Sequence, residues 1–267
     1  ARIGLGCPGI LDYQAGVMVN PTNFPGWHGF PIRDRLAEHL GMPVVMSNDA
    51  SAAAYGEMWI GSGRGCRSVV LLTLGTGIGC GAIVHDVIIE GEHGHGTECG
   101  HILIDPSPTA PICSCGKTGH LEAFASATAV VNRTRELLAA GKCRAIAERM
   151  AAGETLNPRL IAALAHEGDA EALDIILETA RYLGLGIVTL LHTFDPSVVL
   201  LGGAMTFGGQ ASPIGRRFLQ RIREEIRERA FPALVEKVSI RFAALGGDAG
   251  FIGAAGIARM VCRRDRG

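Results

Sequence analysis

The chain has 267 residues, of which 48% are apolar and 19% are charged, and its formal net charge is −1. A chain of this length can bury one large core or two modest ones, and this composition excludes disorder as its main state. The charge balance provides no basic surface for nucleic acid and none for an anionic membrane. Because we find no signal peptide and no apolar run long enough to span a bilayer, we expect a cytoplasmic protein.

The pattern of apolar and turn-forming residues predicts an α/β fold. The expected elements of the first half are, in chain order, a strand that breaks into a turn over 2–9, a turn-rich loop at 20–27, a helix at 31–40, a strand at 42–46, a helix at 51–58 and two strands at 68–73 and 81–89. The second half is expected to contain a loop-rich stretch at 91–120, helices over 122–193, a strand at 198–201, a helix at 213–230, a strand at 238–243 and a C-terminal helix. The charges of the 213–230 helix indicate a solvated, salt-bridged face.

Eight cysteines are spread unevenly along the chain, which argues against a disulfide framework. Five of them lie among apolar or small neighbours, as buried free thiols typically do: Cys7, Cys66, Cys80, Cys143 and Cys262. Cys113 and Cys115 differ, because a close pair flanked by histidines suggests a metal site.

Glycine is unusually frequent, with 37 residues, and the expected strand at 68–73 runs into Gly75-Thr-Gly-Ile-Gly-Cys-Gly81. This is not a Walker loop, because no Gly-Lys-Ser/Thr follows. It is not a dinucleotide fingerprint either, because a strand and not a helix comes next. It is either an ordinary tight hairpin or one whose N–H groups and Thr76 hydroxyl hold phosphate oxygens.

Asn48 and Asp49 follow the expected strand at 42–46, at its carboxyl end, where α/β proteins place ligand sites. The alternative is that Asp49 only caps the helix at 51–58, as aspartate often does. Both roles are compatible.

Four nitrogen and sulfur ligands, the number that structural zinc prefers, are supplied by His101, Cys113, Cys115 and His120. The alternative is a chance thiol pair, and we favour zinc. Glu98 and Glu122 bracket this loop. Their carboxylates either accept hydrogen bonds from sugar hydroxyls or are simply surface acids.

Taken in order, these stretches resemble the ROK family of bacterial sugar kinases and sugar-responsive repressors. The matching stretches are Gly4-Leu-Gly-Cys-Pro-Gly9, Asn23-Phe-Pro-Gly-Trp27, Asn48-Asp-Ala50, Leu74-Gly-Thr-Gly-Ile-Gly79, Glu98-Cys-Gly-His101, Cys113-Ser-Cys-Gly-Lys-Thr-Gly-His-Leu-Glu122 and Asp195-Pro with Leu201-Gly-Gly203. They span nearly the whole chain in the family's order. The pair Glu-x-Gly-His and Cys-x-Cys-Gly-x-x-Gly-x-x-Glu is highly specific.

The resemblance implies an actin/hexokinase-like (ribonuclease H-like) fold, with two α/β domains, a ligand cleft and a structural zinc loop at 98–122. Residues 1–55 and about 254–267 would form the small domain, and residues 56–253 would form the large one. ROK proteins are commonly dimers, so we expect a homodimer or a higher homo-oligomer.

The resemblance also implies ATP-dependent phosphorylation of a hexose, with glucose at its 6-hydroxyl as the first candidate. Asp49 would be the general base that takes the proton from this hydroxyl. The other sugar hydroxyls would be held by Asn23, Asn48, Glu98, His101 and Glu122. Phosphates and nucleotide would contact Gly75, Thr76, Gly77, Gly79, Gly202 and Gly203, and Mg²⁺ would bridge the phosphates. Zinc would be structural, with one ring nitrogen of His101 on the metal and the other facing the sugar.

Two features depart from the family pattern. His120 stands where the family usually has a third cysteine, and histidine is a competent zinc ligand. The family's N-terminal Asp-x-Gly-Gly-Thr phosphate hairpin is absent from the given residues. We therefore expect poor ATP turnover from a protein that begins at Ala1.

Two functions of other classes compete with the kinase. A sugar-sensing transcriptional repressor would bind sugar without phosphorylating it, and would carry a winged helix-turn-helix before Ala1. A purely structural zinc module would leave Asp49 and both glycine-rich strand ends without a purpose. Among kinases, those for N-acetylmannosamine, N-acetylglucosamine, fructose and allose share the same motifs, so the sequence does not select the sugar.

Overall fold

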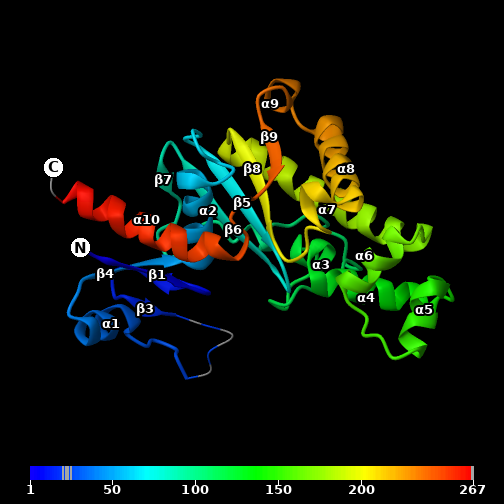
Figure 1. The fold of residues 1–267 in the computed structure, drawn as a ribbon, viewed down its shortest axis with the longest axis horizontal. Helices are drawn as coiled ribbons and strands as arrows, with labels where there is room; N and C mark the ends of the chain where they lie inside the picture. The colour runs from blue at the N-terminus through cyan, green and yellow to red at the C-terminus, as the bar shows by residue number, and fades with distance from the viewer. Residues whose placement is uncertain (20, 22–23, 25, 266–267) are drawn as a thin grey trace.

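The computed structural model describes residues 1–19, 21, 24 and 26–265, and has an α/β architecture (Figure 1). The strands are β1 (Ile3–Cys7), β2 (Leu11–Asp12), β3 (Val17–Met18), β4 (Val44–Asn48), β5 (Val69–Leu74), β6 (Ile78–Val84), β7 (Val87–Ile88), β8 (Val198–Gly203) and β9 (Ser239–Phe242). The helices are α1 (Ile32–Leu40), α2 (Asp49–Ile60), α3 (Glu122–Ala125), α4 (Ala127–Ala139), α5 (Arg144–Ala151), α6 (Pro158–His166), α7 (Ala170–Phe194), α8 (Pro213–Arg229), α9 (Pro232–Val235) and α10 (Ala249–Arg264).

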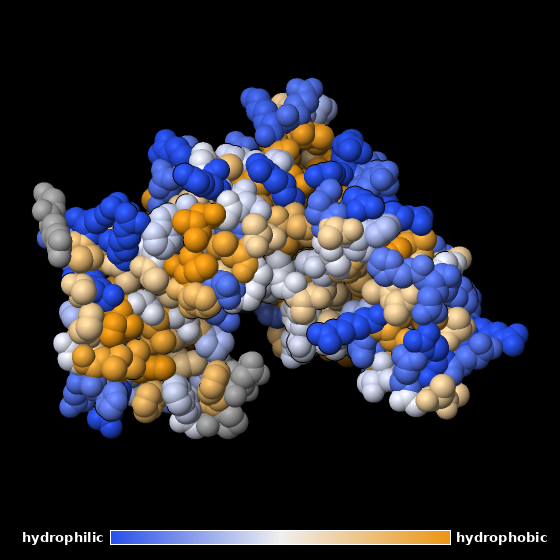
Figure 2. Space-filling model, in the orientation of Figure 1, coloured by the Kyte–Doolittle hydropathy of each residue, from blue (hydrophilic) through white to orange (hydrophobic). Residues whose placement is uncertain are grey.

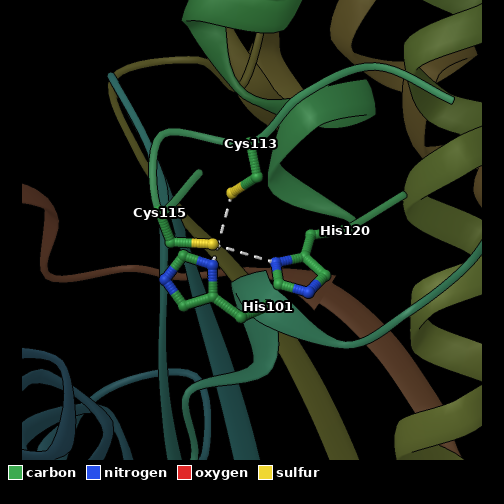
Figure 3. Close-up of side chains that lie close together, drawn as sticks. All are labelled: His101, Cys113, Cys115 and His120. Carbon is green, nitrogen blue, oxygen red and sulfur yellow. Dashed lines mark hydrogen bonds between the residues drawn. The ribbon is translucent and has the colours of Figure 1, made fainter. Parts of the chain in front are cut away.

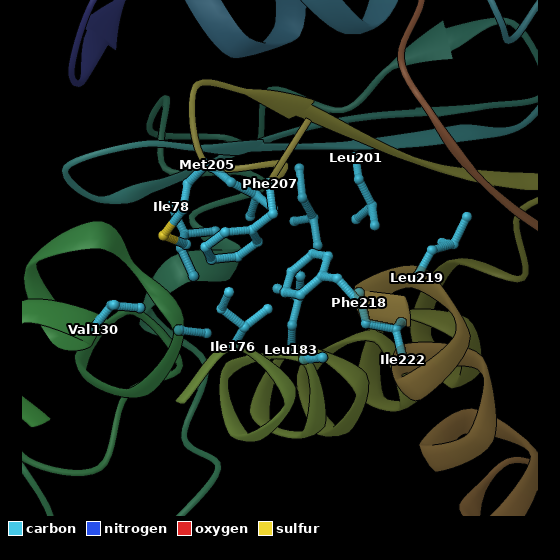
Figure 4. Close-up of a cluster of buried hydrophobic side chains, with 14 of the residues drawn as sticks. Ile78, Val130, Ile176, Leu183, Leu201, Met205, Phe207, Phe218, Leu219 and Ile222 are labelled. Atoms are coloured by element: carbon cyan, nitrogen blue, oxygen red, sulfur yellow. The ribbon is translucent and has the colours of Figure 1, made fainter. Parts of the chain in front are cut away.

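The larger sheet has the order β7-β6-β5-β8-β9, with β5, β8 and β9 parallel and β6 antiparallel to β5. Its strands are apolar on both sides because both faces are covered. Val70 and Leu72 of β5 face the main core, whereas Val69 and Leu71 face α2 and the start of α10. Figure 4 shows the main core, in which Phe207 and Phe218 pack in an edge-to-face pair between the sheet and α7.

The N-terminal part contains a separate parallel pair, β1 and β4, whose register places Cys7 opposite Asn48. Helix α10 returns from the far end of the chain to pack on β1, β4 and α2, as Figure 1 shows. Small residues make this crossing close. A Cβ atom on Gly253 would lie 1.6 Å from the carbonyl oxygen of Ala52, so no larger residue fits there without movement.

A buried carboxylate fixes the end of α2. Glu57 has no exposed surface, and its two oxygens accept hydrogen bonds from the backbone N–H groups of Ser62 and Leu245, both at 2.7 Å. Two backbone donors compensate for removing the carboxylate from water. Glu57 therefore connects α2 to the segment that leads into α10.

Helix α7 is long and apolar enough to cross a bilayer by length and composition, so our expectation that no such run exists is wrong by that criterion. More than half of its apolar window is buried inside the protein. Within the described residues it packs against α3, α4, α6 and α8, as a central core helix does.

Most of the expected elements are present, with boundaries shifted by a few residues, but the single strand expected at 81–89 is wrong, because β6 and β7 are two antiparallel strands joined by a turn at His85 and Asp86. The strand expected at 42–46 is β4, two residues later, and α2 begins at Asp49 instead of Ser51. The short hairpin of β2 and β3 was not predicted, because two-residue strands carry too little apolar alternation to detect. Cys66 and Cys262 are half-buried, so the prediction of buried thiols holds for the other three of that group.

Candidate active site and metal centre

A small cavity of about 170 Å³ opens beside the first turn of α2. Residues near the β1–β4 pair and in the larger sheet line it, including Gly9 after β1, Asn48 at the end of β4, Asp49 directly after it, and Gly79 in β6. Glycines and polar side chains make up most of its lining, which suits one small polar ligand. The carboxyl end of β4 therefore meets the glycine-rich strand at a pocket.

Asp49 is the first helical residue of α2, and it is exposed to the cavity. One carboxylate oxygen accepts a hydrogen bond from the N–H of Ala50 at 2.8 Å. The surrounding protein still shields the group from bulk water, and this burial raises the pKa of Asp49 above the ordinary aspartate value. A carboxylate with a raised pKa in a pocket is suited to accept a proton near neutral pH.

The helix cap is Asn48, so the alternative that Asp49 caps this helix is wrong. The Asn48 side-chain oxygen accepts hydrogen bonds from the N–H groups of Ala50 and Ser51, at 2.9 and 3.2 Å. Its amide nitrogen donates to the carbonyl of Gly9 at 3.2 Å. The cap leaves the Asp49 side chain available to a ligand.

Glu98 lines both this cavity and a much larger cleft of about 1690 Å³. Its carboxylate lies 4.0 Å from Nε2 of His101, which also lines the large cleft. Figure 2 shows the hollow between the N-terminal part and the helical part of the molecule. Glu98 and His101 thus continue the polar lining from the small cavity into the cleft.

The four predicted metal ligands lie together, as Figure 3 shows. Their ligand atoms are all within 4.8 Å of one another. Sγ of Cys113 is 3.4 Å from Nδ1 of His101, and Sγ of Cys115 is 3.2 Å from Nδ1 of His120. The two isolated bridges Leu103 to His120 and Ile112 to Thr118 hold the loop in this shape.

This arrangement fits a tetrahedral zinc ion. Zn–S and Zn–N bonds of about 2.3 and 2.0 Å separate the ligand atoms by roughly 3.3–3.8 Å, so only a small contraction is needed. Burial raises the pKa of the Cys113 thiol to about 11, and a divalent cation would replace its proton. Partial burial and the neighbouring His101 lower the pKa of His120, which favours the neutral, ligating form.

Since Nδ1 of His101 faces the thiols, its Nε2 faces Glu98 and the cleft. A metal on Nδ1 would fix which ring nitrogen is free to meet a ligand. The geometry therefore allows the double role that the family resemblance implies for His101.

The glycine turn between β5 and β6 borders the large cleft through Thr76 and Gly77. The carbonyl of Gly75 accepts from the N–H of Ala127, and the carbonyl of Thr76 accepts from the hydroxyl of Thr128, both at 2.9 Å. These two hydrogen bonds from the start of α4 restrain the backbone conformation of the glycine turn.

The remaining predicted nucleotide contacts are divided between two places. Gly79 lines the small cavity with Asp49 and not the large cleft. Gly202 and Gly203 line neither, but the register of β8 with β5 places Gly203 opposite Leu74, directly before the glycine turn. Gly203 has a φ of +87°, and a Cβ there would lie 2.3 Å from the carbonyl oxygen of Leu74, so glycine is required.

Of the predicted sugar contacts, Asn48, Asp49 and Glu98 share the small cavity, whereas Glu122 lies in the large cleft. One oxygen of Glu122 accepts from the N–H of Ile78 at 3.0 Å, and the other accepts from the hydroxyl of Ser114. Asn23 lies outside the described residues.

The sequence did not point to two further residues of the small cavity, Tyr13 and Glu90. Tyr13 follows β2 in a hairpin that was not predicted, and Glu90 follows the short strand β7. The only available signal was an acid immediately before Gly91, which is too common to single out.

Comparison with known proteins adds family membership. The family model described as "ROK family" matches residues 1–261. The chain belongs to the ROK family. It is 37% identical over 251 residues to a glucokinase of Halalkalibacterium halodurans, a match that covers 94% of this chain and 74% of that protein. It is 31% identical over 246 residues to a xylose repressor of Caldicellulosiruptor bescii, covering 91% of this chain and 58% of the repressor.

The fold is shared with solved ROK structures. A ROK glucokinase from Streptomyces griseus, in complex with glucose and AMPPNP, superposes with a TM-score of 0.80 at 32% identity. The match covers 96% of this ROK chain and 81% of the glucokinase chain. Kinases and a repressor therefore both stand among its relatives.

Proposed function

We propose that this ROK chain catalyses ATP-dependent phosphorylation of a hexose, with glucose at its 6-hydroxyl as the first candidate. The observation that carries the proposal is Asp49, a carboxylate with a raised pKa in a small polar cavity, beside Asn48 and Glu98. The glucokinase relatives and the ROK glucokinase structure with glucose and a nucleotide analogue support the same reaction class.

In this proposal, Asn48, Glu98 and His101 hold the sugar ring, and Glu122 and Asn23 complete its contacts. Asp49 accepts the proton of the attacking hydroxyl. The glycine turn and the end of β8 hold the nucleotide, with residues 1–55 and 254–267 as one domain and 56–253 as the other. Mg²⁺, entering with ATP, would offset the phosphate charge. His101, Cys113, Cys115 and His120 would hold zinc, which would orient His101 and take no part in the chemistry.

The test is ADP release over a panel of hexoses by the full-length protein, with Asp49→Asn beside it. We expect turnover of at least one hexose, and a loss of about 10²- to 10⁴-fold in kcat for Asp49→Asn with sugar binding retained. Asp34→Asn on the exposed helix α1 is the matched control, and should keep full activity.

The second candidate is a sugar sensor without kinase activity, which the repressor relative favours. Sugar-dependent stabilisation with no ADP release from any hexose would select the sensor and overturn the kinase.

A further inference from the structure

Two side chains of the small cavity have no part in the proposed function. Tyr13 lies in the turn between β2 and β3, and Glu90 lies after β7, yet both line the cavity that contains Asp49. The cavity therefore has three carboxylates, those of Asp49, Glu90 and Glu98. No arginine or lysine is among its described lining residues.

The backbone holds Glu90 firmly in place. Its carbonyl accepts a hydrogen bond from the N–H of Gly96 at 2.8 Å, which closes the loop between them. The loop is too tight for side chains, because a Cβ on Gly96 would lie 2.5 Å from the carbonyl carbon of Glu90. Gly94, at a φ of +71°, lies so close to β2 that a Cβ would be 2.0 Å from the carbonyl oxygen of Leu11. The loop that carries Glu90 is therefore packed against the hairpin that carries Tyr13.

The two side chains line the same cavity, and burial raises the pKa of both groups above their ordinary values. A carboxylate can accept about four hydrogen bonds, so Glu90 has acceptor positions for a ligand.

From this placement we infer that Glu90, which lines the cavity together with Tyr13, is a specificity-determining residue that accepts a hydrogen bond from one ring hydroxyl of the sugar. The inference rests on the proposed sugar-binding role of this cavity and adds the class of sugar that it selects. A site lined by acceptors selects donors, and a site built around a hydroxyl rejects analogues that lack it.

The selected class is a neutral sugar. Three carboxylates disfavour sugar acids and sugar phosphates through like-charge repulsion.

The test is calorimetric binding of glucose and of 2-, 3- and 4-deoxyglucose to the full-length protein. The variants are Glu90→Gln, Tyr13→Phe and, as a matched control, Glu92→Gln, which is exposed on the same loop and lines neither cavity. We expect the unmodified protein to discriminate strongly against one deoxy sugar. Glu90→Gln should weaken glucose binding by about 10- to 100-fold and abolish that one discrimination alone. Tyr13→Phe should reduce the same discrimination by less, and Glu92→Gln should change nothing.

Each other outcome is decisive. If the unmodified protein binds hexoses, and Glu90→Gln and Tyr13→Phe keep its affinity for glucose and its discrimination among the deoxy sugars, the inference is wrong and the proposed function stands. Equal weakening of all four sugars would also overturn the inference, because it would indicate a role in folding and not a contact. If the unmodified protein binds no hexose, the proposed function falls, and the inference falls with it.

Discussion

Asp49 combines access to the small cavity with partial burial by the surrounding protein. It reaches the cavity, yet burial raises its pKa above that of ordinary aspartate. A general base works only when ionised, so its protonation removes activity.

The pH dependence of the reaction should report this group. We expect kcat/KM for glucose to fall as the pH drops through the pKa of Asp49, at a pH above the ordinary range of aspartate. The measurement is a pH–rate profile, repeated in Glu90→Gln because burial raises the pKa of Glu90 in the same cavity. If the acidic fall in kcat/KM is absent from the profile of Glu90→Gln, it reports the titration of Glu90, which would contradict the assignment to Asp49.

The metal site makes a second prediction for single residues. Cys113→Ala should abolish stoichiometric zinc binding, because it removes one of four ligands, and should lower the melting temperature by several degrees. Zinc content by elemental analysis and thermal unfolding check it. Cys66→Ala, a half-buried thiol in another loop, should leave zinc content unchanged. Full zinc content in Cys113→Ala would show that the metal is held elsewhere.

The chemistry of single residues was partly visible in the sequence. The ligands His101, Cys113, Cys115 and His120 were predicted because their short spacing restricts them to one loop, and the structure brings them together. Tyr13 and Glu90 could not be predicted, since each has an ordinary local context. Only the tertiary packing of the loop at Gly94 on β2 brings them to Asp49.

At the scale of elements, the crossing of α2 and α10 depends on glycine. Gly253→Ala should destabilise the protein by several kcal/mol, because its Cβ would lie 1.6 Å from a backbone oxygen of α2. Gly250→Ala in the same helix has open space around it, and should stabilise by about 0.5–1 kcal/mol. Urea unfolding of the two variants checks both signs. Equal changes in the free energy of unfolding for the two variants would show that α2 and α10 can move apart at no cost in stability.

Element types were predictable where the apolar pattern was long, as in α8, where Phe218, Ile222 and Ile226 are buried as expected. The residues at which elements begin and end were less predictable than the element types, as the start of α2 illustrates. The helix starts at Asp49 because the side chain of Asn48, the last residue of β4, caps it, and which of two adjacent polar residues caps depends on the backbone of β4. Which strands pair, such as β1 with β4, depends on contacts that local sequence does not contain.

For the whole molecule, the contacts between the β1–β4 pair and the larger sheet include those made through α2 and α10. Helix α2 packs on both, α10 packs beside it, and the buried carboxylate of Glu57 fixes the end of α2 to the chain before α10. The small cavity lies between these parts, so a ligand that contacts both would favour their closure.

The position of α10 also constrains how the protein is made. Strands β1 and β4 are synthesised before α10, which packs on both and begins only at Ala249. At about 5–20 residues per second, a ribosome needs roughly 10 to 40 seconds to cover this distance. For that time a nascent chain lacks the α10 side of a two-stranded sheet, and such sheets are marginal alone. A chain that stops at Leu245 should therefore be insoluble and accumulate in the pellet during expression. If α10 added as a separate peptide restores the solubility of that chain, the order of synthesis is unimportant.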